Sequence, residues 1–397
     1  MMNESMAIKP AICCLGYNRP ESMKRLLKSI GMAKYQRNDI TLIISIDECP
    51  DSDNVQKIAD EFVWNYGEKI VKRYPERLGV KKHTLLVGDL SYKYGAVIYL
   101  EDDIVVSPGY YIYTSEALGK YGNDKEVFGV ALYNQRWLGS AQTEFVPEYN
   151  GEDVYLFSGD VSWGQCWIAD QWKSFHDWYD NHMNGLPEYD SRVPKEVYLW
   201  DTNSSWSKYV SFFLAEKQMS YVVPYESYST CFSDKGVHTG MNSDHCQVPL
   251  SQSVKEDFRF PLVENCVKYD AFFERVDPFV DEIAGIRISD ICIDFNGEKY
   301  DFSGYKAVLT TKELKYKCVQ SFGVNMDPIE LNIKYNNPGT SIRLYELPSN
   351  GAQNMFEQIP YPIVSNDRVF HQQGKCRFNV LWGVIVNKIR NHLGWQV

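Results

Sequence analysis

The chain has 397 residues, of which 44% are hydrophobic and 14% aromatic, so it is too long for one ordinary domain and has ample material for a packed core. This composition excludes general disorder, and a formal net charge of -11 argues against a dedicated nucleic-acid-binding protein, which needs a basic surface. We find neither a signal-peptide pattern at the start nor an apolar run of membrane-spanning length, and the ten cysteines are scattered without metal-type clustering. We therefore expect a cytoplasmic protein with free thiols.

Strand and helix signals alternate through the first hundred residues. The predicted elements are a strand at 11–16, a helix at 18–31, a strand at 41–46, a helix at 55–66, a short strand near 70, a helix at 80–92 and a buried strand at 96–100. Such alternation is typical of a parallel α/β sheet covered on both faces, whose ligands bind beyond the carboxyl ends of the strands. Tyr17, Asp47 and Glu101 follow three of these strands, so we expect them around one crevice.

The pattern changes twice after this region. Residues 105–260 are irregular and rich in Trp and Tyr, which we interpret as the second half of the same domain. Apolar residues then alternate from 286 to 295 and are followed by Asn296-Gly297, which predicts a strand and a tight hairpin turn. Segments 331–335 and 341–345 flank another turn and are also predicted as strands. We therefore expect a first domain at 1–270, a β-rich domain at 280–370 and a C-terminal tail at 375–397.

Three carboxylates, Glu101-Asp102-Asp103, follow the buried strand at 96–100. Like charges at the tip of a buried strand are costly, because they repel one another and lose solvation. A divalent cation offsets that cost, and hard oxygen ligands suit Mg²⁺ or Mn²⁺, which also bridge to phosphate oxygens. The alternative interpretation is a solvated acidic turn; the strand that precedes it favours a metal site.

Residues 97–103, Val-Ile-Tyr-Leu-Glu-Asp-Asp, followed by Ser107-Pro108, resemble the modified Asp-x-Asp motif of glycosyltransferases with the GT-A fold, a Rossmann-like nucleotide-sugar-binding domain. The nearest likeness is to animal N-acetylglucosaminyltransferase I and to related bacterial transferases of surface polysaccharides. In that family the last acid holds the metal, and the first two contact the sugar and the ribose. The resemblance implies Asp103 as the metal ligand, with Glu101 and Asp102 on the donor.

Other segments match the same family in the same order, over about the first 250 residues. The resemblance implies donor contacts by Tyr17, Asn18 and Arg19 with the nucleotide, by Asp47 with the uracil, by Lys82 and His83 in the segment 77–83 with the diphosphate, and by His238 in a Gly-rich closing loop at 235–240. Each match has a plain structural alternative: a helix cap at 18–20, an acidic loop after residue 47, a helix surface at 82–83 and an ordinary turn at 236–240.

The acceptor side and the catalytic base rest on the same resemblance. Ser162-Trp163-Gly164, with Trp167 and Trp172 nearby, resembles the Trp-Gly segment beside the acceptor, although such tryptophans are more often core. The family's base is an Asp that follows a Trp, and Asp201 stands in that place, with a helix cap as the alternative. This chain has Asp-Thr where the family often has two adjacent acids, which leaves the register open. The next candidates for the base are Asp190, Glu196 and Asp234.

These observations predict an inverting, metal-dependent glycosyltransferase. It would move a sugar, GlcNAc or another hexose, from a UDP-sugar to the hydroxyl of a glycan or lipid-linked glycan in the synthesis of bacterial surface polysaccharide, either O-antigen of lipopolysaccharide or capsule. One alternative is a nucleotidyltransferase acting on sugar phosphates, which the single glycine in the first strand-to-helix turn disfavours. Another is a non-catalytic carbohydrate-binding protein. The sequence does not identify the sugar or the acceptor, because pocket shape decides those.

The C-terminal tail lies beyond the family likeness. Residues 368–397 contain no acidic side chain, and apolar residues recur every four positions at Leu381, Ile385, Ile389 and Leu393. A basic amphipathic helix of this kind can lie on an anionic membrane, which predicts peripheral attachment at the inner face of the cytoplasmic membrane. The alternative is a terminal helix docked on the β-rich domain.

Overall fold

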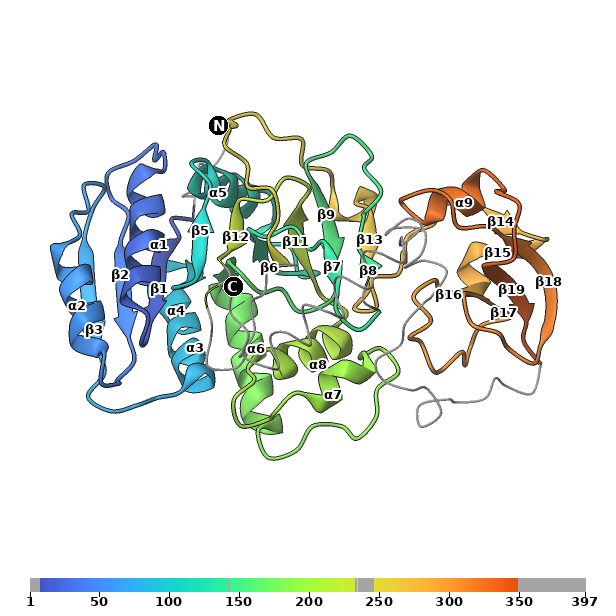
Figure 1. Ribbon diagram of the computed structural model, residues 1–397, viewed down its shortest axis with the longest axis horizontal. Coiled ribbons are helices and arrows are strands. Elements are labelled where there is room, and N and C mark those ends of the chain that lie inside the picture. The colour runs from blue at the N-terminus through green and yellow to red at the C-terminus, as the bar shows by residue number, and fades with distance from the viewer. Residues whose placement is uncertain (1–7, 142, 233, 235–245, 349–397) are drawn as a thin grey trace, which may run out of the picture. The chain divides into compact units, whose positions relative to one another are not determined.

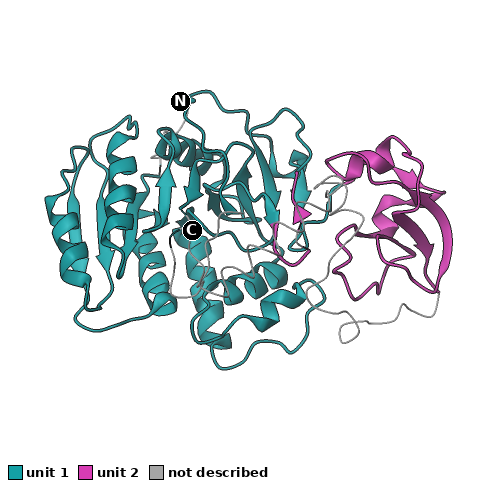
Figure 2. Ribbon diagram, viewed as in Figure 1, with its two compact units in different colours: residues 1–137, 147–277 teal, residues 138–146, 278–397 magenta. Residues whose placement is uncertain are grey.

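The computed structural model describes residues 8–141, 143–232, 234 and 246–348 (Figure 1). The chain divides into two compact units, residues 1–137 with 147–277 and residues 138–146 with 278–397 (Figure 2). The boundary at 277 falls between the predicted first and second domains, whereas no sequence signal marks the excursion of 138–146 into the second unit. The predicted tail at 375–397 and the predicted loop at 235–240 lie outside the described residues.

The first unit is built on one nine-stranded sheet with the order β13-β9-β11-β6-β10-β4-β1-β2-β3. Its strands are β1 (Ala11–Gly16), β2 (Leu42–Ile46), β3 (Lys69–Arg73), β4 (Ala96–Glu101), β6 (Val127–Ala131), β9 (Val154–Phe157), β10 (Gln165–Ile168), β11 (Ser220–Pro224) and β13 (Lys268–Tyr269). Strands β4, β1, β2 and β3 are parallel, while β10 is antiparallel to both β4 and β6. The carboxyl ends of β4, β1 and β2 therefore meet at one edge, as predicted.

Helices and a short ribbon complete this unit (Figure 1). The helices are α1 (Pro20–Met32), α2 (Ser52–Glu61), α3 (Val80–Gly88), α4 (Leu90–Tyr94), α5 (Tyr110–Tyr121), α6 (Ala169–His182), α7 (Lys195–Leu199) and α8 (Ser207–Lys217), with a 3-10 turn at Val263–Asn265. Strand β5 (Ile104–Val106) leaves directly after the carboxylate run and pairs antiparallel with β12 (Ser229–Cys231). Phe232 N donates to Asp103 O at 2.7 Å, so the end of β12 is fixed beside the carboxylates.

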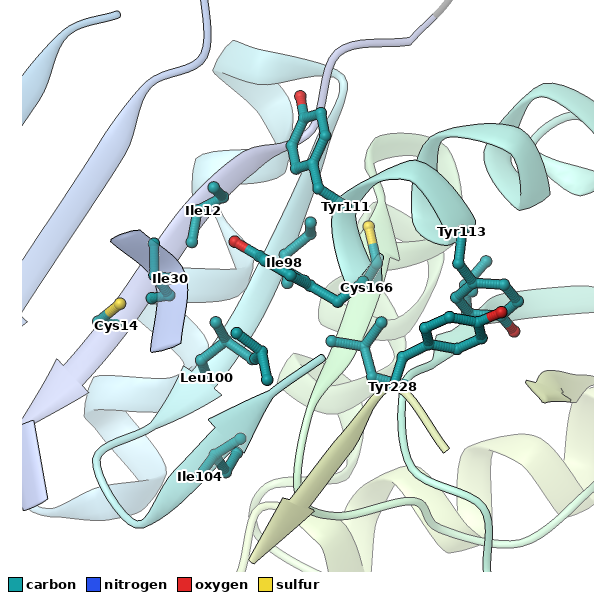
Figure 3. Packing of buried hydrophobic residues seen from close by; sticks show 14 of the residues in the cluster. Ile12, Cys14, Ile30, Ile98, Leu100, Ile104, Tyr111, Tyr113, Cys166 and Tyr228 are labelled. Atoms are coloured by element: carbon teal, nitrogen blue, oxygen red, sulfur yellow. The ribbon is translucent and has the colours of Figure 1, made fainter. Parts of the chain in front are cut away.

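The central strands are held by apolar packing between the sheet and the helices over it. All six residues of β1 are buried, and α1 places Met23, Leu26 and Ile30 on its inner face at helical spacing. Figure 3 shows this core, in which Ile12 of β1, Ile30 of α1 and Leu100 of β4 lie together, while Tyr113 of α5 stacks on Tyr228. Full burial of each such side chain contributes about 1.5–3 kcal/mol, which fixes the strands whose tips carry the polar groups.

The second unit contains a four-stranded sheet with the order β16-β17-β19-β18. Its elements are β14 (Glu282–Ile283), β15 (Ile286–Arg287), a 3-10 turn (Ile288–Asp290), β16 (Ile291–Asp294), β17 (Ala307–Thr310), β18 (Lys317–Phe322), α9 (Glu330–Lys334) and β19 (Ile342–Glu346). A further short pair of strands, β7 (Trp137–Leu138) and β8 (Thr143–Glu144), lies in and next to residues 138–146, which belong to the second unit. The α/β fold class and the smaller β-rich part predicted from the sequence are confirmed.

Two local predictions in the second unit are wrong. Asn296-Gly297 does not join a hairpin, because β16 pairs parallel with the next strand, β17. Residues 331–335, predicted as a strand, contribute most of α9 instead. The buried side chain of Asn332 explains the helix: its Oδ1 accepts from Asn325 N, and its Nδ2 donates to the main chain at Met326 and Ile329. These hydrogen bonds close a compact turn, and in an extended strand the side chain of Asn332 would lose these partners.

Candidate active site

A cavity of about 220 Å³ opens at the carboxyl ends of β1, β2 and β4. It is lined by Leu15, Gly16, Tyr17, Asn18, Arg19, Asp47, Arg77, Gly79, Val80, His83, Tyr99, Glu101, Asp102 and Asp103. The structure therefore brings together most of the site residues predicted from the sequence. Lys82 is exposed and does not line the cavity, and His238 lies outside the described residues.

The turn after β1 requires a close approach between backbone and side chains. A Cβ placed on Gly16 would lie 2.7 Å from Met23 Cε and 3.0 Å from a methyl of Val55, so a larger residue would require these two side chains to shift. Pro20 then begins α1 in its first turn, where its missing N–H is not needed. This tight turn brings Arg19, just ahead of the helix, over the cavity.

Asp47, expected to contact uracil, holds the loop after β3. Its carboxylate accepts from three main-chain donors: Leu78 N at 2.7 Å, Gly79 N at 3.0 Å and Glu48 N at 2.9 Å. Gly79 has a φ of 76°, a conformation that glycine adopts at little cost. A carboxylate has about four lone-pair sites, and here three are engaged, so the observed role of Asp47 is to fix this loop against the cavity.

His83, expected at the diphosphate, is a buried neutral group. Its Nε2 is hydrogen-bonded to Ser45 Oγ at 2.7 Å, and its ring packs edge-on against Tyr74. Burial lowers the pKa of His83 from 6.5 to about 4, so the imidazole carries no charge at neutral pH. The positive charge that the segment 77–83 brings to the cavity is Arg77, whose guanidinium lies 5.0 Å from the ring centre of Tyr17.

The three carboxylates at the end of β4 lie in three different environments. Glu101 Oε1 accepts from Tyr99 O–H at 2.9 Å, and burial raises the pKa of Glu101 above its ordinary range. Asp102 is paired with Arg19 Nη2, yet burial still raises the pKa of Asp102 to about 6. Asp103 Oδ2 lies 3.2 Å from Arg19 Nη1, while Asp103 Oδ1 is buried and has no hydrogen-bond partner in the described part of the chain. Tyr99 was not among the predicted site residues.

The donor set fits a metal held by one carboxylate rather than by a protein cage. Within residues 8–141, 143–232, 234 and 246–348, no group of three or more His, Cys, Asp or Glu side chains converges as metal ligands. The buried, unsatisfied Oδ1 of Asp103 is a suitable oxygen ligand. Mg²⁺ in particular is commonly held by one or two carboxylates together with substrate phosphates and water.

Asp201, the predicted base, is exposed and caps a turn. It accepts from Asn203 N at 3.1 Å and from Ser204 Oγ at 2.8 Å, but the next helix, α8, begins only at Ser207, so Asp201 does not cap a helix. Asp201 does not line the cavity, but the next residue is bonded to α3: Lys81 Nζ, one position after the lining residue Val80, donates to Thr202 O at 2.7 Å. The hydrogen bonds from Ser204 and Asn203 lower the pKa of Asp201.

The Trp-Gly segment before β10 combines an unusual backbone with a buried acid. Trp163 has a φ of 60°, which is uncommon for a large side chain, and Trp167 and Trp172 are fully buried and belong to the core. Asp160, which the sequence did not single out, has its Oδ1 buried with no partner in the residues described. Burial raises the pKa of Asp160 to about 7, in the range suited to a general base.

The fold and the cavity define an α/β protein with a carboxylate-lined pocket at the carboxyl edge of parallel strands. No family model and no curated protein matches the chain. Among solved structures, S. aureus TarS 1–349 aligns at 12% identity and a TM-score of 0.36, covering 57% of this chain and 60% of that one. Its complex with UDP-GlcNAc aligns at 12% identity and a TM-score of 0.37, covering 58% and 60%.

A mannosyltransferase, PcManGT from Pyrobaculum calidifontis in complex with GDP-Man and Mn²⁺, aligns at 12% identity and a TM-score of 0.33, covering 55% of this chain and 59% of that one. The alignments thus span less than two thirds of each of these structures. With TM-scores this low, the likenesses support no inference about activity, and any functional assignment rests on the residues of the cavity. None of the three is an N-acetylglucosaminyltransferase I, so that finer resemblance stays a sequence-based prediction.

In the part of the chain that the structure describes, no helix is both long enough and apolar enough to cross a bilayer.

Proposed function

We propose that this protein is a metal-dependent, inverting glycosyltransferase that uses a nucleoside diphosphate sugar. The observation that carries the proposal is one cavity at the meeting point of three strand ends, lined by Arg77 and by a buried carboxylate run that is paired with Arg19. Cations beside acidic metal ligands are what a sugar diphosphate requires, because the diphosphate needs positive charge and the metal needs oxygen donors.

The roles follow from the contacts. Asp103, through its unsatisfied Oδ1, would hold Mn²⁺ or Mg²⁺, which when bound supplies charge neutralisation to the departing diphosphate. Arg77, the cation that lies over Tyr17, would contact a phosphate oxygen. Glu101 and Asp102 would contact the sugar and the ribose, as the family resemblance implies.

The base must take a proton from the acceptor hydroxyl. We retain Asp201 as the proposed base, supported by the hydrogen bond between Lys81 and Thr202 that joins its turn to α3, whose first residue, Val80, lines the cavity. Its lowered pKa makes Asp201 a weaker proton acceptor at neutral pH, and the alternatives from the sequence are Asp190, Glu196 and Asp234. Replacement of each acid by its amide distinguishes them: only the base should lose transfer while donor binding persists.

The test of the function is release of UDP from a panel of UDP-sugars, with Mn²⁺ or with EDTA, in the presence and absence of saccharide acceptors. A transferase releases UDP in a metal- and acceptor-dependent manner. A nucleotidyltransferase would instead release pyrophosphate from a nucleoside triphosphate and a sugar phosphate. A carbohydrate-binding protein would release neither, and either of these results would reject the proposal.

The finer assignments stay with this proposal. They are a UDP-linked GlcNAc or other hexose as the donor, a glycan or lipid-linked glycan acceptor, and a place in the synthesis of bacterial surface polysaccharide. Peripheral membrane attachment through residues 375–397 is supported only by the basic, amphipathic sequence of that segment. Sedimentation with anionic liposomes, comparing the full chain with one that ends at Gly374, tests it: equal behaviour of the two proteins would exclude an anchor.

A further inference from the structure

Arg19 links two carboxylates of the acidic run to each other. The residue precedes α1, whereas its partners follow β4, more than eighty positions later. One guanidinium nitrogen pairs with Asp102 Oδ1, and the other lies 3.2 Å from Asp103 Oδ2. The side chains are largely shielded from water, at 21% exposure for Arg19, 6% for Asp102 and 18% for Asp103, so solvent screens this interaction less than it screens a surface ion pair.

The surrounding charges make this pairing necessary in the absence of a ligand. Glu101 and Asp234 add further negative charge close by: Asp234 acts on both Asp102 and Asp103, and Glu101 acts on Arg19. Asp234 has its own cation, because its carboxylate is paired with Arg25 and also accepts from Ser22 Oγ. Among the residues described, Arg19 is therefore the cation paired with the acidic run itself.

A divalent cation and the Arg19 guanidinium would compete for the same acid. Asp103 gives Oδ2 to Arg19 and has Oδ1 unsatisfied, and the two oxygens belong to one carboxylate. A metal bound to Oδ1 would thus lie within a few ångströms of a fixed positive charge, at a site of reduced dielectric. A diphosphate beside Arg19 would relieve that repulsion, because its oxygens accept from the guanidinium in the same two-pronged geometry as a carboxylate does.

We infer that Arg19 is a resident counter-cation that opposes binding of a divalent metal at Asp103, and that Asp102 retains the guanidinium while its other nitrogen turns from Asp103 to the donor diphosphate. This inference rests on the proposed function and adds a coupling to it. Metal binds weakly alone and more tightly with the diphosphate, and the two affinities change by the same factor in both directions.

The experiment measures Mn²⁺ affinity by electron paramagnetic resonance, without and with UDP, in the full-length protein. Arg19→Ala removes the competing cation, so its Mn²⁺ affinity without UDP should rise about tenfold or more over the wild type, and the enhancement by UDP should shrink. Arg19→Lys keeps a charge without the planar fork and should fall between the two. Its result decides the matter if Arg19→Ala does not fold, which circular dichroism will show.

Arg77→Gln is the matched control. Arg77 lines the same cavity but is not paired with Asp102 or Asp103, so this variant should bind UDP less tightly and leave the Mn²⁺ affinity without UDP unchanged. Equal or weaker Mn²⁺ binding by Arg19→Ala overturns the inference, because Arg19 would then be orienting the metal ligand. If no variant binds Mn²⁺ under any condition, the inference also fails, and UDP release in EDTA then decides separately whether sugar transfer stands.

Discussion

Lowering the pH from 7.5 to 5 should destabilise the first unit through His83. The buried imidazole has a pKa of about 4, whereas in the unfolded chain it titrates near its ordinary 6.5. A histidine whose folded pKa is lowered contributes full stability above pH 6.5 and loses it as the pH falls, because only the unfolded chain binds the proton. Between pH 6.5 and 5 that loss amounts to about 2 kcal/mol, at about 1.4 kcal/mol for each pH unit.

The assay is urea unfolding at pH 7.5 and pH 5, followed by tryptophan fluorescence, which reports on the buried Trp167 and Trp172 of the same unit. His83→Gln should lose about 2 kcal/mol less than the wild type between the two pH values, whatever its absolute stability. His176→Gln is the control of opposite sign, because the hydrogen bond to Asp89 raises the pKa of His176, and protonation therefore stabilises the folded state. If the wild type and His83→Gln lose equal free energy, the buried neutral histidine is not the acid-sensitive group.

Three further predictions concern the site and the core. Asp103→Ala should fold and lose metal-dependent turnover by about a hundredfold or more, and undiminished UDP release in a kinetic assay would contradict the assigned metal ligand. Asp201→Asn should bind donor normally and lose roughly 10² to 10⁴ in transfer rate; near-normal transfer would move the base elsewhere. Gly88→Ala should be destabilised by about 1–3 kcal/mol or more, because its Cβ would overlap Trp172 at 1.9 Å, whereas Gly119→Ala in open space within α5 should be stabilised by about 0.5–1 kcal/mol in thermal unfolding.

The cavity could be predicted because the sequence itself shows where the buried strands end. Apolar runs that stop at Gly16, Ile46 and Glu101 identify parallel strands, and parallel strands must place their following residues at one edge. That geometry alone brings Tyr17, Asp47 and the acidic run together. This prediction depends only on local apolar patterns, and these patterns form the same strands in the folded protein.

The partners of those residues could not be predicted in the same way. The pairing of Arg19 with Asp102, and the bonds from Leu78 and Gly79 to Asp47, join segments that only the tertiary fold brings into contact. His83 is an example: its neighbours Lys81 and Lys82 make the segment basic in sequence, but burial lowers the pKa of His83 and keeps its imidazole neutral.

The same gap explains the errors in the second unit. Alternating apolar residues predict a strand but not its neighbour in the sheet, so the sequence predicts a hairpin at Asn296-Gly297 that the parallel pairing of β16 and β17 excludes. Likewise, Asn332 interrupts an apolar pattern as a surface residue would, and only the fold shows that its side chain is buried and fully bonded.

The hydroxyl of Tyr99 sets a direction in the hydrogen bonds beneath the cavity. Tyr99 donates to Glu101 Oε1, so the 3.1 Å contact between Tyr99 and Thr84 must be one in which Thr84 donates. In this series of hydrogen bonds, Thr84 donates to Tyr99 and Tyr99 donates to Glu101, so Oε1 of Glu101 already acts as an acceptor. On the proposed function, a sugar hydroxyl that bonds to Glu101 would meet a carboxylate in which one oxygen already accepts a hydrogen bond from the core of the sheet.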